Sequence, residues 1–182
     1  MERRQRVRRT AFICLHTIAN VACLRAGRDT KAIRQCHHFY SRAHSNFADI
    51  AILSWCKVFA DKKGMHYCLN VVSDPSRFMR ELLNQLQITQ ADFDAHIRIV
   101  KNLRDKFIAH LDSDITAPLP KLDLALNSVG FLLEYLFRHE NHEKHLEGIA
   151  RFPDPIYRLA YDDARLAYKG EPDVRRSGGR AD

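Results

Sequence analysis

The sequence has few of the residues that interrupt regular structure. Its 182 residues include only 7 glycines and 6 prolines. Strands need frequent turns, which use these residues, whereas long helices do not. No Gly-rich phosphate loop, internal repeat or strand-like alternation occurs either. With 46% hydrophobic residues, the chain is therefore expected to be all-α and to bury a core without metal or disulfides.

Cysteines are few, odd in number and dispersed. The five are Cys14, Cys23, Cys36, Cys56 and Cys68. An odd count without close pairing argues against the disulfide framework of a small secreted protein. Three of them, Cys14, Cys36 and Cys56, fall in apolar helical patterns, where buried thiols are common. We interpret these cysteines as structural.

No run of eighteen apolar residues is present, so the sequence predicts no membrane span. The start of the chain does imitate an export signal, with Arg8-Arg9 before an apolar stretch. However, His16, Asn20 and Arg25 interrupt that stretch, and no clean small-residue cleavage site follows. We therefore expect a cytoplasmic protein without membrane contact.

Positive charge is concentrated at the N-terminus. The formal net charge is +7, of which residues 1–9 carry +4, residues 169–182 carry +1 and the remainder +2. An arginine-rich arm of this kind can contact phosphates. It can equally be the solvated start of a helix, and the sequence leaves both readings open.

Apolar residues recur at helical spacing along most of the chain. The pattern predicts an antiparallel helical bundle, with one domain over residues 1–168 and a disordered tail over 169–182. Gly27 is expected to end the first helix, and Asp29 or Thr30 to cap the second. The sequence signals for starting helices are also clear at Asp74-Pro75 and at Thr89. The expected helices cover 5–26, about 30–60, about 75–86, about 90–110, 121–139 and 155–168.

The segment from Arg104 to Asp112 carries the residues best suited to chemistry. Arginine provides a planar, permanently charged donor fork that fits phosphate. Histidine exchanges a proton near neutral pH. Arg104 and His110 together suit metal-independent cleavage of RNA. In such a reaction the 2′-hydroxyl is the internal nucleophile, which makes the substrate RNA and not DNA.

The spacing also permits a purely structural reading. Six residues along an α-helix advance by roughly 240° and about 9 Å, so Arg104 and His110 do not share a face. They can cooperate only if the helix is distorted near His110 or if two subunits contribute. Alternatively, Arg104 forms an ion pair with Asp105 or Asp112, and His110 caps the helix C-terminus.

The ordered set of motifs resembles the HEPN family (higher eukaryotes and prokaryotes nucleotide-binding), in its abortive-infection branch. The resemblance covers roughly residues 30–138. Its strongest part is Arg104-Asp105-Lys106 with Ala109-His110-Leu111-Asp112. The other matching pieces are Trp55-Cys56-Lys57-Val58-Phe59, Phe78 with Leu82-Leu83, Phe93, and Pro120-Lys121-Leu122-Asp123 with Ala125-Leu126.

The resemblance implies a homodimeric bundle that acts as a ribonuclease, as a toxin or in phage defence. Arg104 and His110 map onto the catalytic pair of the family, and Asp105 onto its polar position. Lys106 and Asp112 are candidates for substrate binding. RNA and a neutralising antitoxin protein are the expected partners, and no cofactor is expected. The alternative is a non-catalytic helical module that binds a nucleotide, RNA or a protein.

Three histidines spaced by three, His139, His142 and His145, could suggest a metal site. On a helix their side chains fan over roughly 120°, which is too wide for three good ligands. We interpret them as part of a solvated polar segment and expect no metal.

Overall fold

The computed structural model describes residues 2–30, 38–109, 120–141 and 144–170. Within these ranges all the regular secondary structure is helical and no strand occurs, which confirms the expected all-α class. The elements are α1 (Arg3–Asp29), α2 (His38–Phe59), α3 (Cys68–Val71), α4 (Pro75–Leu86), α5 (Gln90–Leu103), the π-helix η2 (Arg104–Ala109), α6 (Asp123–His139) and α7 (Pro153–Lys169).

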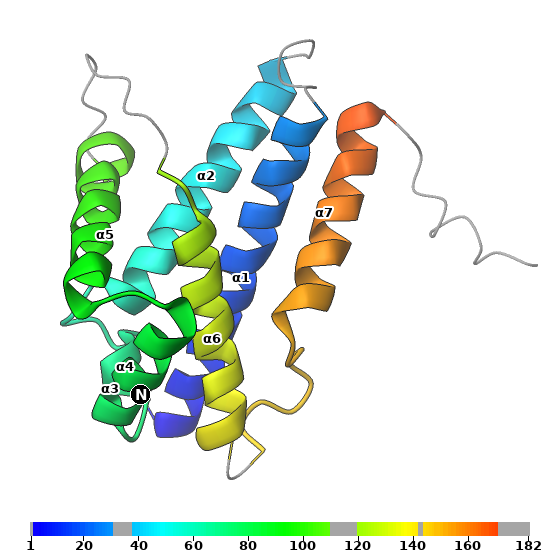
Figure 1. Cartoon of the computed structure of the whole chain (residues 1–182). Helices are drawn as coiled ribbons and strands as arrows, with labels where there is room; N and C mark the ends of the chain where they lie inside the picture. The colour runs from blue at the N-terminus through cyan, green and yellow to red at the C-terminus, as the bar shows by residue number, and fades with distance from the viewer. Residues whose placement is uncertain (1, 31–37, 110–119, 142–143, 171–182) are drawn as a thin grey trace, which may run out of the picture.

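Helix α1 is the centre of the bundle. It packs against α2, α6 and α7, and α5 packs on the far side of α2. Figure 1 shows α5, α2, α1 and α7 following one another across the molecule, with α6 in front of α2 and α1. Helices α1, α5 and α7 run in one direction, and α2 and α6 run in the other. The described helices therefore form a largely antiparallel bundle.

The composition of α1 also passes a test for membrane helices. By length and mean hydropathy this helix could cross a membrane, although 56% of the relevant window is buried inside the protein. The sequence predicted no membrane span because α1 contains no uninterrupted apolar run, whereas its mean hydropathy is high despite single polar residues. Val7, Ala11, Cys14, Ile18 and Val21 form its completely buried face. In this bundle α2, α6 and α7 occupy that face.

Aromatic side chains join α2, α5 and α6 beneath the motif region. Trp55 stacks on Phe59 with ring centroids 5.4 Å apart, and Phe93 meets Trp55 edge-on at 6.4 Å. The Trp55 indole Nε1 donates a hydrogen bond of 2.9 Å to Ser128 Oγ on α6. A buried indole needs such a partner, because an unpaired buried donor is costly. These contacts fix the position of α5 relative to α2 and α6.

Local signals set the starts of two helices as predicted. Asp74 accepts a hydrogen bond from the Arg77 backbone N–H at 2.9 Å, with Pro75 in the first turn of α4. Thr89 and Asp92 form a reciprocal capping box at the start of α5.

The predicted stop at Gly27 was wrong, because α1 continues to Asp29. A Cβ atom at position 27 would lie 2.7 Å from Tyr168 Cζ and 2.8 Å from His44 Nδ1. Gly27 therefore permits close packing of α2 and α7 on α1 and does not end the helix. Asp29 is the last residue of α1 and Thr30 is its C-terminal cap, whereas α2 as described begins at His38. Lys169, expected in the tail, ends α7, and residues 171–182 lie outside the described part.

Candidate functional site

The motif begins where the backbone leaves α-helical geometry. Helix α5 ends at Leu103, and residues Arg104–Ala109 form the π-helix η2, in which hydrogen bonds span five residues. Such widened turns are rare and are frequent at functional sites. The sequence predicted that one subunit can bring Arg104 and His110 together only if the helix is distorted near His110. The helix departs from α-helical geometry over Arg104–Ala109, immediately before His110. His110 and Asp112 themselves lie outside the described residues.

The Arg104 guanidinium is held by two carboxylates. Its Nε donates to Asp105 Oδ1 at 2.8 Å, and its Nη1 donates to Asp61 Oδ1 at 2.5 Å. The side chain retains only 16% of its exposure. The pairing with Asp105 is one of the structural alternatives that the sequence left open. Asp61 was missed, because it lies 43 residues earlier in a polar turn that carries no motif.

These ion pairs fix both the charge and the direction of Arg104. Burial by itself lowers the pKa of Arg104, but the hydrogen bonds to Asp61 and Asp105 outweigh burial and raise it. Arg104 therefore stays cationic at every pH relevant to the protein. The three groups together carry one negative charge, so additional cations are needed to attract a phosphate.

A cavity of about 720 Å³ beside Arg104 supplies those cations. It lies between the turn that follows α2 and one face of α5. Five basic and two acidic side chains line it, for a net charge of +3: Lys62, Lys63, Arg98, Lys101 and Arg104 against Asp61 and Asp94. Since Asp61 is engaged by Arg104, the other four cations are opposed mainly by Asp94. The cavity can therefore bind an anion. We call it the basic cavity.

Of the predicted substrate contacts, only Lys106 lies among the described residues. It is exposed on η2 and does not line the basic cavity. Asp105 is near the cavity only through its ion pair with Arg104. The structure thus brings Arg104 and Asp105 together, adds Asp61, and leaves Lys106 at the surface.

Two groups next to the site do not supply a nucleophile or a base. Burial raises the pKa of Cys56 to about 12, although the positive charge of Arg104 opposes this rise. The thiol is therefore protonated at neutral pH and unreactive. The His96 ring lies edge-on to Trp55 at 5.2 Å, and its Nε2 is buried without a hydrogen-bond partner in the described part of the chain. Burial lowers the pKa of His96, which is consistent with a neutral histidine packed beside the core.

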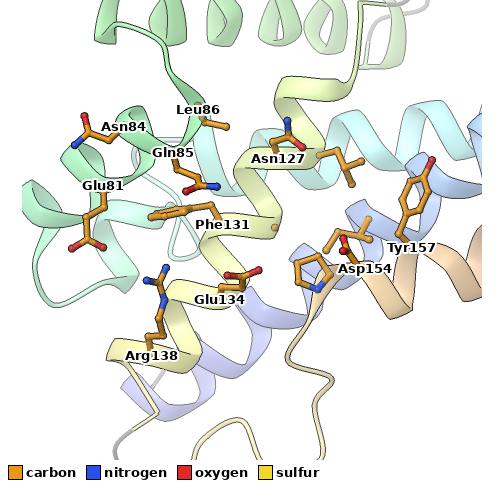
Figure 2. Close-up of a pocket in the computed structure, with 14 residues that line it drawn as sticks. Glu81, Asn84, Gln85, Leu86, Asn127, Phe131, Glu134, Arg138, Asp154 and Tyr157 are labelled. Atoms are coloured by element: carbon orange, nitrogen blue, oxygen red, sulfur yellow. The ribbon is translucent and has the colours of Figure 1, made fainter.

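A larger cavity lies elsewhere and has the opposite charge. It measures about 830 Å³ and runs over α6 between α4 and the start of α7. Figure 2 shows Phe131 and Gln85 near one another, while Glu134 extends toward the start of α7. Three acidic residues and one basic residue line it: Glu81, Glu134 and Asp154 against Arg138. This acidic groove contains none of the predicted site residues and repels phosphate.

The histidines near the end of α6 are described in part. The His139 ring packs on Tyr135 at 4.4 Å, and His145 is buried, whereas His142 lies outside the described residues. Burial of His145 shows that this segment is less solvated than the sequence predicted. No group of three His, Cys, Asp or Glu side chains within the described ranges has the arrangement of a metal site.

Comparisons of the chain with protein-family models, curated proteins and solved structures find no match. Function therefore has to be inferred from the site itself.

Proposed function

We propose that the protein is a cytoplasmic, homodimeric, metal-independent RNA endonuclease of the HEPN type, with Arg104 and His110 as the catalytic pair. One observation supports this most strongly. A guanidinium oriented by two carboxylates lies at the edge of a cavity with a net charge of +3, at the point where α5 widens into the π-helix that leads to His110.

The proposed reaction is attack of a ribose 2′-hydroxyl on the adjacent phosphorus. The O2′–P bond forms and the P–O5′ bond breaks, which leaves a 2′,3′-cyclic phosphate and a 5′-hydroxyl. His110 takes the proton from the 2′-hydroxyl or protonates the leaving oxygen, and water completes the other of these two proton transfers. Arg104 stabilises the charge that develops on the phosphoryl oxygens. Asp105 and Asp61 orient the guanidinium, so it needs little rearrangement during the reaction.

The surrounding cations would hold the neighbouring phosphates of the strand. Lys62 and Lys63 come from the turn after α2, and Arg98 and Lys101 come from one face of α5. Phosphates flanking the scissile bond would be neutralised by these side chains. Lys106 and Asp112 stay candidates for further substrate contacts.

The decisive test is cleavage of RNA in the presence of a chelator. Wild type is expected to cleave, and Arg104→Ala and His110→Ala are each expected to lose roughly 10² to 10³-fold in rate. Arg158→Ala is a matched control, because Arg158 is exposed on α7. Cleavage that needs a divalent metal, or that persists in both variants, would contradict the proposal.

A mixing experiment tests the dimer. Neither Arg104→Ala nor His110→Ala subunits should be active alone. If each site combines Arg104 of one copy with His110 of the other, heterodimers contain one intact site and mixing restores activity, to about a quarter of wild type for random pairing. If both residues act within one copy, mixing restores nothing. A monomer by light scattering would exclude the dimer.

The second candidate function is a non-catalytic module that binds a protein. The acidic groove favours it, because a net negative cavity of about 830 Å³ suits a basic segment of a partner such as a neutralising antitoxin. Expression in cells separates the two candidates. A nuclease should be toxic, with His110→Ala abolishing toxicity, whereas a binding module should behave identically with and without His110.

A further inference from the structure

A second concentration of positive charge lies at the start of α1. Arg6, Arg9 and Lys57 are all close enough to His66 to lower its pKa, in addition to the larger effect of burial. No carboxylate acts on His66 among these influences. The imidazole Nδ1 lies 3.4 Å from the hydroxyl of Thr10 on α1. We call Arg6, Arg9, Lys57 and His66 the outer basic centre.

One residue connects this centre to the basic cavity. The side-chain amide of Asn70 donates to the backbone carbonyls of Lys62 and Gly64, at 3.1 and 3.0 Å. The backbone carbonyl of Asn70 accepts from Arg6 Nη1 at 3.4 Å. The turn that carries Lys62 and Lys63 is therefore fixed between Arg6 on one side and the cavity on the other.

Two other arginines of the N-terminal arm, Arg3 and Arg8, have partners in the chain that follows α6. Arg3 forms an ion pair with the buried carboxylate of Glu140, which also accepts from the Ser73 backbone and hydroxyl. Arg8 donates to the backbone carbonyls of His145 and Glu147. The arm is thus divided, with Arg3 and Arg8 holding the chain after α6 and Arg6 facing the turn at Lys62. The sequence could not distinguish these roles.

We propose that a single RNA strand leaves the basic cavity, crosses the turn at Lys62–Lys63 and continues along the outer basic centre. Helix α1, which lies outside the family resemblance, then forms the second half of the substrate track. The proposal rests on the proposed function for the direction of the strand. It specifies a single strand, because a cavity of about 720 Å³ accommodates a nucleotide-sized group and not a duplex.

The charges that oppose such a strand are few and accounted for. Asp61 and Asp105 are engaged by Arg104, so they repel a phosphate less than free carboxylates would. Asp94 lines the cavity and accepts from the Gln90 side chain at 3.1 Å. The phosphates of a continuous strand would thus meet basic side chains on both sides of the turn.

Binding is best measured with all proteins carrying His110→Ala, so that the RNA stays intact. The probes are labelled oligouridylates of about 4 and about 16 nucleotides, titrated by fluorescence anisotropy over a series of salt concentrations. The variant is Arg6→Gln with Lys57→Gln. The matched control is Arg151→Gln with Arg158→Gln, which removes the same charge from exposed positions at and before α7. Thermal melts show whether each protein is folded.

The variant should bind the long strand about tenfold more weakly, with a salt slope reduced by about 1.4 for two lost phosphate contacts. Its affinity for the short strand should match that of the control. Equal weakening for both lengths, an equal effect in the control, or tighter binding of duplex than of single strand would overturn the track.

These binding data, taken together with the RNA cleavage assay, separate this inference from the proposed function. If wild type fails to cleave RNA but long-strand binding still depends on Arg6 and Lys57, the nuclease proposal fails and the track stands as a binding surface. If wild type cleaves and these two residues have no effect on long-strand binding, only the track fails.

Discussion

The basic cavity and the acidic groove are similar in volume, about 720 and 830 Å³, and opposite in charge. The basic cavity lies where α5 passes into a π-helix, whereas the groove runs along the unbroken α-helix α6. The difference teaches that volume alone is a poor guide to function in this molecule. The charge of the lining and the departure from regular backbone both point to the smaller cavity.

The two cavities also differ in how their charges are paired. In the basic cavity, Arg104 engages Asp61 and Asp105, which leaves the lysines facing solvent and ligand. In the acidic groove, Arg138 lies over the Phe131 ring at 5.7 Å, and Glu81 is bound by Arg77 outside the lining. Glu134 and Asp154 thus keep the groove negative.

Reversing the charge of the basic cavity should have the largest effect of the variants that compare the two cavities. Replacing both Arg98 and Lys101 with Glu changes the charge of the basic cavity by four units. We expect RNA affinity to fall by about 100-fold or more, because like charges then face the phosphates. Reversing Glu134 to Lys in the groove should leave affinity within about twofold, since the charge of a distant, partly exposed side chain is screened. Anisotropy titrations with a labelled oligouridylate measure both. Equal losses would mean that the two cavities do not differ in function.

The core beneath the site gives the next largest effect, on stability. Ser128→Ala leaves the buried Trp55 N–H without its partner, so the free energy of unfolding should fall by about 1 to 3 kcal/mol. Denaturant unfolding measures this loss. RNA cleavage at low temperature, where the variant stays folded, should be unchanged. A normal stability would show that the hydrogen bond does not hold α2 to α6.

Loss of an orienting carboxylate should have a smaller effect on activity. Asp61→Asn removes the charge that directs Arg104 Nη1, and we expect kcat to fall about tenfold with little change in KM. Asp61→Glu should recover part of the rate, because it restores the ion pair. Glu134→Gln, an equal change of charge in the groove, should have no effect. If all three variants match wild type, the Asp61 pair is structural only.

Most of the fold was predictable because its signals are local. The starts of α4 and α5 follow from side chains within three residues of Asp74 and Thr89, and the apolar spacing of α1 follows from its own turns. The predicted helix end at Gly27 was wrong, because glycine is needed there for the close approach of Tyr168, more than a hundred residues away.

The site was predictable only in part, because some of its contacts join residues that are far apart in the sequence. Arg104 and Asp105 are adjacent, so their pairing was a visible alternative. Asp61 and the lysines of the basic cavity meet Arg104 only through the packing of α2 against α5. The π-helix depends on long-range packing that residue spacing does not encode, and the pairing of Arg104 with His110 stays a prediction.

Protonation of partly buried histidines should give the smallest effect. The pKa values of His66, His96 and His139 are all lowered, mainly by burial. The unfolded chain therefore binds more protons than the folded one below the ordinary pKa of 6.5, and the free energy of unfolding should decrease as the pH falls from 7 toward 5. Denaturant unfolding across this range measures the slope.

Two variants compare the outer basic centre with the end of α6 through this slope. His66 has only cations acting on it, whereas Glu81 and Glu140 partly offset the shift at His139. His66→Gln should therefore flatten the pH dependence more than His139→Gln. The reverse order would mean that the outer basic centre carries less positive field than its residues indicate.

The central position of α1 has a consequence for synthesis of the protein. This helix is translated before α6 and α7, two of the helices that cover its apolar face, and these begin about a hundred residues later or more. At ribosomal speeds that delay is on the order of ten seconds. During that time the apolar face of α1, which arginines flank, is exposed to chaperones and to the targeting machinery. Rapid capture by α2, the next helix to emerge, would be the first protection of the nascent chain.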